Sequence, residues 1–377
     1  MNKEKQYNKL VPKLRFPEFV NDGEWKEEIL GGVADIVTGT TPKTAEPKNY
    51  NGDKLFASPA DISENRYLDK TNKTLSQLGF SKSRVIPENS ILFVCIGSTI
   101  GKIAQNRIEC ATNQQINSLI PFDKHSNDFI YSLLEYNSSR IALLAGHQAV
   151  PLINKTDFSE ILICIPPSKL EQKKIANCLS SLDNLITAET EKLALLKNHK
   201  KGLLQQLFPA KGEKKPQFRF PEFVGDGDWE EDKLSNLILN ISPPKKLKSS
   251  QFQENGKYPI IDQSQNKIAG WSDDEKAIVK NDFPLIIFGD HTCVLKIVEN
   301  PFVQGADGIK ILKGNTFVNT RYLYYALQNN PLMMKEYKRH YSILKEKLIF
   351  YPDVNSGEQQ KIANCLSSLD DLIEVQT

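Results

Sequence analysis

The 377-residue sequence has little that would place it in a membrane or outside the cell. No run approaches the ~18 consecutive apolar residues that a membrane-spanning helix needs. The opening residues, MNKEKQYNKLVPK, lack the apolar core of a signal peptide. The six cysteines include no Cys-x-x-Cys pair, so reduced thiols are expected rather than zinc ligands or disulfides. We therefore expect a cytoplasmic protein with no metal site.

A strong excess of either charge is also missing, since 48 basic and 46 acidic residues give a net charge of +2. Residues 31–165 carry 13 basic and 13 acidic groups, residues 169–208 carry 7 and 4, and residues 234–350 carry 16 and 11. Such a chain cannot bind DNA through a uniform layer of lysines. If it binds DNA, partner subunits must supply part of the phosphate neutralisation that dominates affinity.

The longest regular pattern lies between Pro167 and Pro209, where the only glycine is Gly202. Apolar residues there alternate at spacings of three and four, which is typical of a coiled-coil helix. At ~1.5 Å per residue a helix over 168–208 would be roughly 55–60 Å long, which indicates a spacer. Its seam comprises Ile175, Leu179, Leu182, Ile186, Leu193, Leu196, Leu203 and Leu207.

Two segments of the chain occur twice. EQKKIANCLSSLDNLI at 171–186 recurs as EQQKIANCLSSLDDLI at 358–373, with 14 of 16 positions identical, and LRFPEFVNDGEW at 14–25 recurs as FRFPEFVGDGDW at 218–229. The chain is therefore a tandem of two units, each beginning with RFPEF and ending in the helix. We call these repeated segments the frames of the two units, and the dissimilar segments between them the inserts. The similarity of the frames suggests that they share one mechanical role, and the dissimilarity of the inserts suggests that each has its own specificity. The second seam comprises Ile362, Leu366, Leu369 and Ile373.

Both inserts contain short apolar runs bounded by turn signals, together with helical patterns. Strands are expected at Ile91–Ile96, Ile161–Ile165 and Phe283–Phe288, and helices at Phe129–Leu144 and Arg321–Gln328. Each insert is thus expected to be a mixed α/β domain. The expected segments are an N-terminal arm with the first frame (1–30), the first insert (31–167), the spacer helix (168–208), a linker with the second frame (209–233), the second insert (234–355) and the distal helix (356–377).

Two segments resemble motifs that bind nucleotides or flipped bases, but each lacks a required residue. Gly97–Lys102 resembles a P-loop, but three residues rather than four separate its glycines, and Ile103 stands where a magnesium-binding hydroxyl belongs. Ser242–Lys245 (SPPK) resembles the signature of amino-methyltransferases, but Lys245 cannot stack on a flipped base as an aromatic residue does.

Two further segments resemble acid–base or nuclease chemistry. Glu171-Gln-Lys173 could indicate a nuclease, yet the second copy has Gln360 in place of the lysine, so helix capping and solvation explain both copies better. Asp290 and His291 could form an acid–base pair, although an Asp beside a loop His is more often a hydrogen-bonded turn. We expect no catalytic residue in this chain.

Polar loop residues remain as candidates for DNA contact. Asn and Gln can bond adenine through two hydrogen bonds, and Lys can reach guanine or phosphate. Ser and Thr can make either kind of contact, to a base or to a phosphate. Polar residues are common in any surface loop, so residues 113–115 could equally just end a strand. The candidates are Thr38, Thr40, Thr41, Lys43, Ser98, Thr99, Lys102, Asn113, Gln114 and Gln115 in the first insert, and Lys245, Lys246, Lys248, Gln263, Gln265, Asn266, Asp290, His291 and Thr292 in the second.

RFPEF followed by a Trp, then PPSKLEQKKIA and a long helix ending in KKGLLQQLFP, resembles the specificity subunit of type I restriction-modification systems over essentially the whole chain. The resemblance implies two α/β (mixed α+β) target-recognition domains in tandem, separated by long coiled-coil-forming helices in a pseudo-two-fold arrangement. Each insert would read one half of a bipartite double-stranded DNA target. The helices would hold the halves apart and dock two methylation subunits, through which restriction (translocase) subunits join.

The same resemblance implies that this chain is not an enzyme and that S-adenosylmethionine, ATP and Mg belong to the partner subunits. A coiled-coil adaptor that binds protein or glycan, and a truncated regulatory specificity subunit, stay open as alternatives. The second copy of the helix stops at Thr377, the position aligned with Thr190. We therefore expect the distal half of the first helix, from Leu193 to Leu207, to lack a partner in this chain and to recruit a second copy or a methylation subunit.

Overall fold

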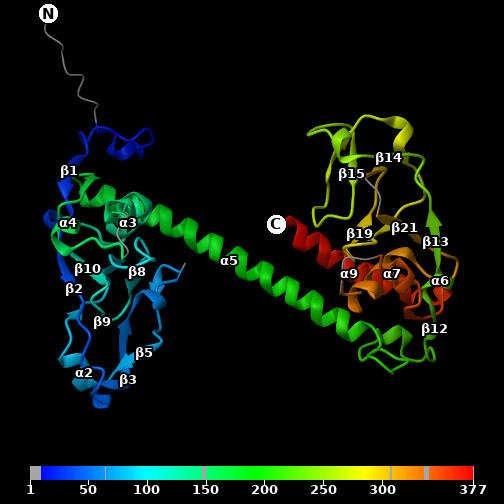
Figure 1. Cartoon of the computed structure of the whole chain (residues 1–377), viewed down its shortest axis with the longest axis horizontal. Coiled ribbons are helices and arrows are strands. Elements are labelled where there is room, and N and C mark those ends of the chain that lie inside the picture. The colour runs from blue at the N-terminus through cyan, green and yellow to red at the C-terminus, as the bar shows by residue number, and fades with distance from the viewer. Residues whose placement is uncertain (1–9, 64, 147–149, 306–307, 335–338, 377) are drawn as a thin grey trace, which may run out of the picture. The chain divides into compact units, whose positions relative to one another are not determined.

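The computed structural model describes residues 10–63, 65–146, 150–305, 308–334 and 339–376 (Figure 1). The chain forms two compact units, 1–186 and 187–377, so the division falls inside the long helix rather than at its ends. Each unit combines helices with β-sheets, and the mixed α/β prediction is confirmed. None of the helices in the described ranges is long and apolar enough to cross a membrane.

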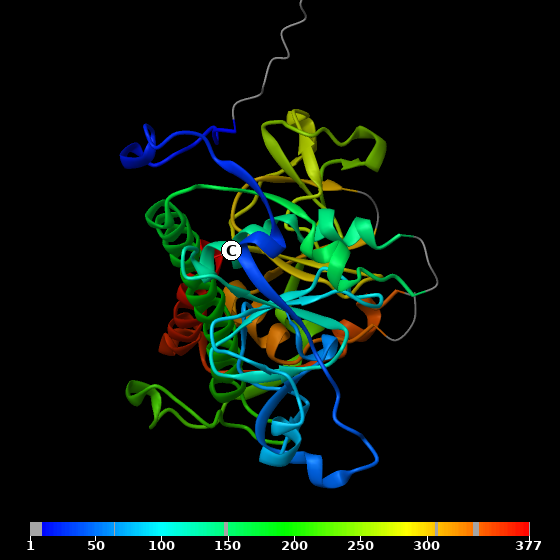
Figure 2. The ribbon, with the colours of Figure 1, turned by 90° about the vertical axis from the view of Figure 1, so that its left-hand side faces the viewer.

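A five-stranded sheet with the order β2-β10-β7-β8-β4 forms the centre of the first unit (blue to cyan in Figure 2). Strand β7 is apolar at all four positions because both of its faces are buried. Ile91 and Phe93 pack against helix α3, and Leu92 and Val94 pack against a second sheet. These elements are β2 (Ala34–Thr38), β4 (Tyr67–Leu68), β7 (Ile91–Val94), β8 (Ile103–Asn106), β10 (Ile116–Pro121) and α3 (Asn127–Ala142).

The second sheet of this unit has the order β5-β3-β9-β6, and β1 pairs with β11 where the insert begins and ends. These strands are β1 (Lys26–Ile29), β3 (Tyr50–Ala57), β5 (Lys73–Leu75), β6 (Val85–Ile86), β9 (Cys110–Thr112) and β11 (Leu162–Ile165). The short helices are α1 (Leu30–Val33), α2 (Gln77–Ser81) and α4 (Lys155–Ser159), with 3₁₀ turns at Pro17–Phe19, Pro47–Asn49, Pro59–Asp61 and Leu143–Ala145.

The second unit repeats this plan with a different sequence. Its central sheet has the order β13-β21-β18-β19, which corresponds to β2-β10-β7-β8, and β12 pairs with β22 as β1 pairs with β11. The elements of this framework are β12 (Glu230–Lys233), β13 (Ile238–Ile241), β18 (Leu285–Gly289), β19 (Leu295–Val298), β21 (Ile309–Gly314), β22 (Leu348–Tyr351), α6 (Leu234–Leu237), α7 (Thr320–Asn329), α8 (Tyr341–Lys345) and α9 (Glu358–Val375).

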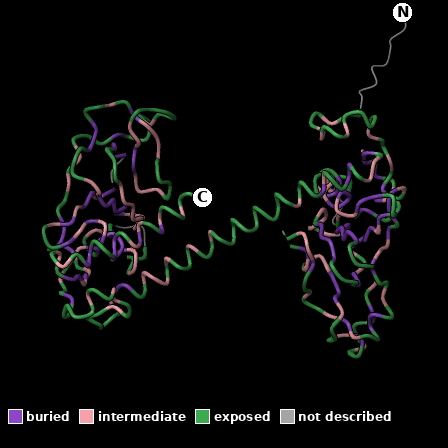
Figure 3. The backbone as a smooth tube through the Cα atoms, turned by 180° about the vertical axis from the view of Figure 1, so that it is seen from behind, coloured by how far each residue is buried: buried purple, intermediate pink, exposed green. Residues whose placement is uncertain are grey.

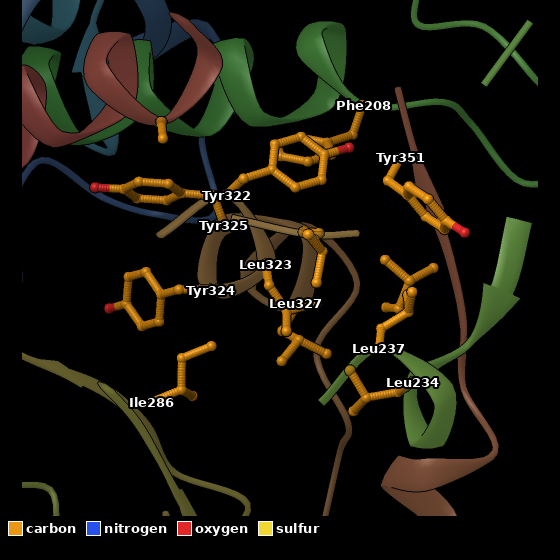
Figure 4. Close-up of a cluster of buried hydrophobic side chains, with 14 of the residues drawn as sticks. Phe208, Leu234, Leu237, Ile286, Tyr322, Leu323, Tyr324, Tyr325, Leu327 and Tyr351 are labelled. Carbon is orange, nitrogen blue, oxygen red and sulfur yellow. The ribbon is translucent and has the colours of Figure 1, made fainter. Parts of the chain in front are cut away.

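A second sheet is built around β20, which pairs with β14, β15 and β17. Its strands are β14 (Lys246–Leu247), β15 (Tyr258–Ile261), β16 (Gly270–Ser272), β17 (Ile278–Val279) and β20 (Phe302–Gly305), and 3₁₀ turns lie at Pro221–Phe223, Ser249–Gln251, Glu275–Ala277 and Val354–Ser356. The core between the central sheet, α7 and α9 is rich in aromatic rings (Figure 4).

A buried ion pair joins the RFPEF segment to the start of the helix in each unit. In the first unit the Arg15 guanidinium donates to both carboxylate oxygens of Glu171 at 2.7 Å, and Trp25 Nε1 donates to the same carboxylate at 3.2 Å. In the second unit Arg219 bonds both oxygens of Glu358 at 2.8 and 2.6 Å. These carboxylates are 0% and 1% exposed, so the interpretation of this position as a solvated helix cap is wrong.

The glutamine that follows this glutamate is also buried and fully bonded. Gln172 accepts from Ser126 N at 2.9 Å and donates to Pro166 O at 2.9 Å. Gln359 accepts from Asn319 N and donates to Pro352 O, each at 2.7 Å. Ser126 and Asn319 are the N-caps of α3 and α7. The repeated Glu-Gln pair therefore fixes the RFPEF segment, the insert helix and the end of the insert to one helix start.

The predicted long helix is confirmed as α5, Lys169–Leu207, but the expectation that its distal half lacks a partner is wrong. Leu203, Leu204 and Leu207 share one core with Ile362 and Leu366 of α9. Lys200 Nζ lies 2.6 Å from the Asp370 carboxylate, and the Gln376 amide lies beside Glu189 and Lys192. Helix α9 therefore covers residues 187–207 in an antiparallel direction, while Leu193 and Leu196 are half-buried.

The buried ion pair predicts a stability effect. Glu358→Gln would leave the Arg219 guanidinium buried without a counter-charge, which typically costs about 3 kcal/mol. Urea unfolding of the second unit should then shift to clearly lower concentration. The matched change Glu346→Gln, which breaks an exposed pair with Lys233, should shift the curve little. Equal curves for the two variants would contradict a structural role of the Arg219–Glu358 pair.

The fold also predicts which thiols react. All six cysteines are free, and burial raises the pKa of the Cys95 and Cys110 thiols to about 12, whereas Cys178 on α5 is exposed. Since the thiolate is the reactive form, iodoacetamide at pH 8 should modify Cys178 in the native protein and should reach Cys95 and Cys110 only after unfolding. Peptide mass mapping measures this order, and native labelling of Cys95 would contradict the burial of this residue directly after β7.

Candidate nucleic-acid interface

The first-insert candidates gather at one edge of the central sheet. Because β2 and β7 run antiparallel to β10, the ends of β2 and β7 lie beside the start of β10. The start of β8 lies there too, because β8 is antiparallel to β7. Three loops therefore meet at this edge, which we call the first loop edge, and they comprise residues 38–43, 95–102 and 113–115.

Side-chain contacts join these loops to one another. The Thr41 hydroxyl donates to Gln114 Oε1 at 2.7 Å, and both residues are exposed. Asn113 Nδ2 donates to Gln115 Oε1 at 2.9 Å, and Gln115 Nε2 reaches Ile96 O at 3.4 Å. Hydrogen bonds thus link the three loops of the first loop edge, which carries exposed hydroxyl and amide groups.

Other candidates at this edge have more structural contacts. Thr38 donates to Asn117 Oδ1 at 2.7 Å, and Thr40 Oγ1 accepts from Arg84 N at 3.1 Å. Lys102 Nζ donates to Ile62 O at 3.0 Å, whereas Lys43 and Ser98 are exposed and Thr99 is half-exposed. Sequence reasoning missed Arg84, an exposed residue whose guanidinium donates to Thr38 O at 2.6 Å. In the sequence, only the short basic segment Lys82-Ser83-Arg84 points to this residue.

The P-loop-like segment is a turn between two antiparallel strands. Residues 97–102 connect β7 to β8, whereas a P-loop connects a strand to a helix. Gly101 has φ +95°, and a Cβ there would lie 3.2 Å from the Ser138 carbonyl oxygen. The glycines therefore serve a tight turn packed against α3, and the rejection of a nucleotide site at this position is supported by the fold.

The second insert forms an equivalent edge, the second loop edge. The end of β13 and the end of β18 lie beside the start of β21, because both strands are antiparallel to β21. Strands β14, β15 and β20 are mutually parallel, so their ends lie at a common edge as well. Of the predicted residues of this insert, Lys246 is the first residue of β14, and the others are in the loops after β13, β14, β15 and β18.

Gln263 brings two of these loops together. Its backbone oxygen accepts from the Thr292 hydroxyl at 2.8 Å, and its Oε1 accepts from His291 N at 3.4 Å. Lys296, which sequence reasoning missed, donates to the backbone oxygens of Asp262 and Asn266. Burial lowers the pKa of Lys296. This lysine holds the 262–266 loop in place, and Gln265 and Asn266 are exposed on it.

Asp290 is a structural residue in this arrangement. Its side chain is buried, with the residue only 4% exposed, and its Oδ1 accepts from His340 N at 2.9 Å and Tyr341 N at 2.7 Å. The carboxylate therefore fixes the start of α8 and is not presented to solvent, unlike the expectation for a DNA-contacting residue. Lys245 pairs with Asp274 at 2.6 Å, and Lys246 and Lys248 are exposed.

The described residues include no group of three or more His, Cys, Asp or Glu side chains that could hold a metal ion. The two loop edges offer amide, hydroxyl and ammonium groups, which can read base edges or contact phosphates. The arrangement can bind a polar polymer, and its two copies carry different side chains.

Comparisons with known proteins agree with this description. The family described as type I restriction modification DNA specificity domain matches residues 22–198 and 226–377. The HindI specificity subunit of Haemophilus influenzae is 31% identical over 185 residues, which are 45% of this chain and 40% of that protein. The putative MjaX specificity subunit of Methanocaldococcus jannaschii is 27% identical over 395 residues, with 94% and 88% of the two chains covered.

A solved structure shows the same fold at low sequence identity. The S subunit of a type-I restriction-modification system from M. genitalium superposes with a TM-score of 0.69 at 18% identity, covering 97% of this chain and 94% of that one. The match to the HindI subunit spans less than half of that relative's length. Because the family match covers most of this chain in two separate regions, the chain belongs to the type I restriction-modification DNA specificity domain family and carries two copies of that domain.

Proposed function

We propose that this chain is the DNA sequence-recognition subunit of a type I restriction-modification complex. The observation that carries the proposal is the pair of loop edges, which lie at equivalent positions on two equivalent sheets and carry different polar side chains. Each edge would read one half of a bipartite duplex target. A protein- or glycan-binding adaptor gains no support from the family match.

The remaining chemistry belongs to partners in this proposal. The chain itself is non-catalytic, and methylation subunits would bring S-adenosylmethionine while restriction subunits would bring ATP and Mg. The near-neutral charge of the chain supports this assembly, because few surplus lysines are available to neutralise phosphates. A cytoplasmic location follows from the need to reach chromosomal DNA.

Base reading at the first loop edge can be tested with Gln114→Ala. Loss of one bidentate amide contact typically costs about 1–3 kcal/mol of discrimination, so the complex with methylation subunits should lose roughly tenfold or more in affinity for its own target. Binding to random duplex should be unchanged. Gel shifts over a salt series measure both, with the exposed Gln77→Ala on α2 as the matched control. An equal loss on both duplexes would mean that Gln114 contacts phosphate only.

The spacer role of α5 can be tested by lengthening it. One heptad inserted between Ile186 and Thr187, where the two compact units divide, adds ~10 Å of helix and nearly preserves its phase. Methylation mapping should show a non-specific gap longer by roughly three base pairs, with both half-sites unchanged. An insertion of equal length in the linker at Gly212 should leave the gap as it was. An unaltered gap in the α5 variant would reject the spacer role.

A further inference from the structure

The second unit contains a cavity that the proposed function does not use. It has a volume of about 820 Å³ and is lined by residues from the end of α5 and the segment after it, from β12, from α7 and from β22. Figure 3 shows the chain in this unit by burial, and the segment after α5, residues 210–215, is exposed. None of the lining residues belongs to the loops of the second loop edge. We call this space the basic cavity.

Three lysines and one glutamate line the basic cavity. The lysines are Lys211, Lys214 and Lys347, and the glutamate is Glu231. None of the three lysines has an ion-pair partner among the residues that the structure describes. Lys347 is half-buried, and burial lowers the pKa of its ammonium group. Because a partly buried charge without a counter-charge is unfavourable, a bound anion would stabilise this lysine.

Apolar and amide side chains complete the lining. Phe208 and Ile349 are each 3% exposed, and Phe350 is half-buried. Gln205 and Asn330 are exposed and carry amide groups that can both donate and accept hydrogen bonds. Small-molecule sites typically measure about 300–1,000 Å³ and combine an apolar wall with a few polar groups that orient the ligand. The basic cavity has this size and this composition.

The first unit has a cavity at the equivalent place, of about 920 Å³, where two of the lysines have apolar counterparts. Leu10 corresponds to Lys214, because the backbone oxygen of each accepts from the backbone nitrogen of the frame tryptophan. Ile161 corresponds to Lys347, because the backbone oxygen of each accepts from the first residue of α1 or α6. Since the first unit folds with leucine and isoleucine at these positions, the fold does not require lysines there.

We propose that the basic cavity binds a nucleotide, with its phosphates at Lys211, Lys214 and Lys347 and its base against the apolar wall. Lysine ammonium groups bind phosphate oxygens as point charges, and three of them face a single carboxylate here. The Phe350 ring offers a surface on which a base can stack. The site uses none of the candidates for DNA contact, so it goes beyond the proposed function.

Calorimetric titration of the full chain with ADP, in a buffer without phosphate, tests this site. We expect saturable binding of one ADP per chain. Lys347→Gln should weaken binding by roughly tenfold or more, because a hydrogen bond between charged groups is lost. The double variant Lys211→Gln and Lys214→Gln should also weaken it. Both of these side chains are exposed, so circular dichroism should show an intact fold.

A matched variant and two fragments of the ligand locate the contacts. Lys345→Gln changes another half-buried lysine, whose ammonium group lies over the Tyr341 ring at 5.6 Å and which does not line the cavity. This variant should bind ADP as the parent chain does. Adenosine and pyrophosphate should each bind more weakly than ADP, because adenosine lacks the phosphates and pyrophosphate lacks the base.

Three results would overturn the proposal. The first is a parent chain that does not bind ADP, or binds it no more tightly than the Lys347→Gln variant does. The second is pyrophosphate that binds as tightly as ADP, since the cavity would then be a site for phosphate alone. The third is a random duplex that displaces ADP from the parent chain and binds more weakly to the Lys347→Gln variant, which would make DNA the occupant.

Discussion

The ion pair between the RFPEF arginine and the glutamate at the helix start is the constraint on which each unit depends. Arg15 and Glu171 are 156 residues apart in the chain, and Arg219 and Glu358 are 139 apart. A buried carboxylate is tolerated only with a counter-charge and good geometry. The two ends of each insert are therefore held together, and the insert begins and ends beside the same helix start.

This closure explains how unlike inserts share one architecture. The first and last strands of each insert pair with each other, as β1 with β11 and β12 with β22. The buried glutamine then ties the N-cap of the insert helix to the same helix start. Because the ends of the insert and the insert helix are fixed, the central sheet keeps its strand order in both units while its loops differ. Different side chains can thus occupy equivalent edges without a change in the frame.

Polar side chains within the two loop edges fall into two groups, those that support loops and those that are exposed to solvent. Asp290 and Lys296 are withdrawn from solvent and hold loops through backbone groups. Thr41 and Gln114 are exposed while bonded to each other. Residue type alone does not distinguish these cases, because a carboxylate or an ammonium group in a loop can equally anchor a neighbouring backbone or face a ligand. The burial of the side chain and the atoms that it bonds distinguish the two cases.

The sequence by itself determined the tandem of two units, the mixed α/β class and the helix over Lys169–Leu207, because repeats and apolar periodicity are local properties of the chain. Only the tertiary structure decided that Glu171 and Glu358 are buried and that α9 covers the distal half of α5. Periodicity shows that a helix has an apolar face, but not which segment packs on it. That choice depends on contacts between residues such as Lys200 and Asp370, which lie far apart in the sequence.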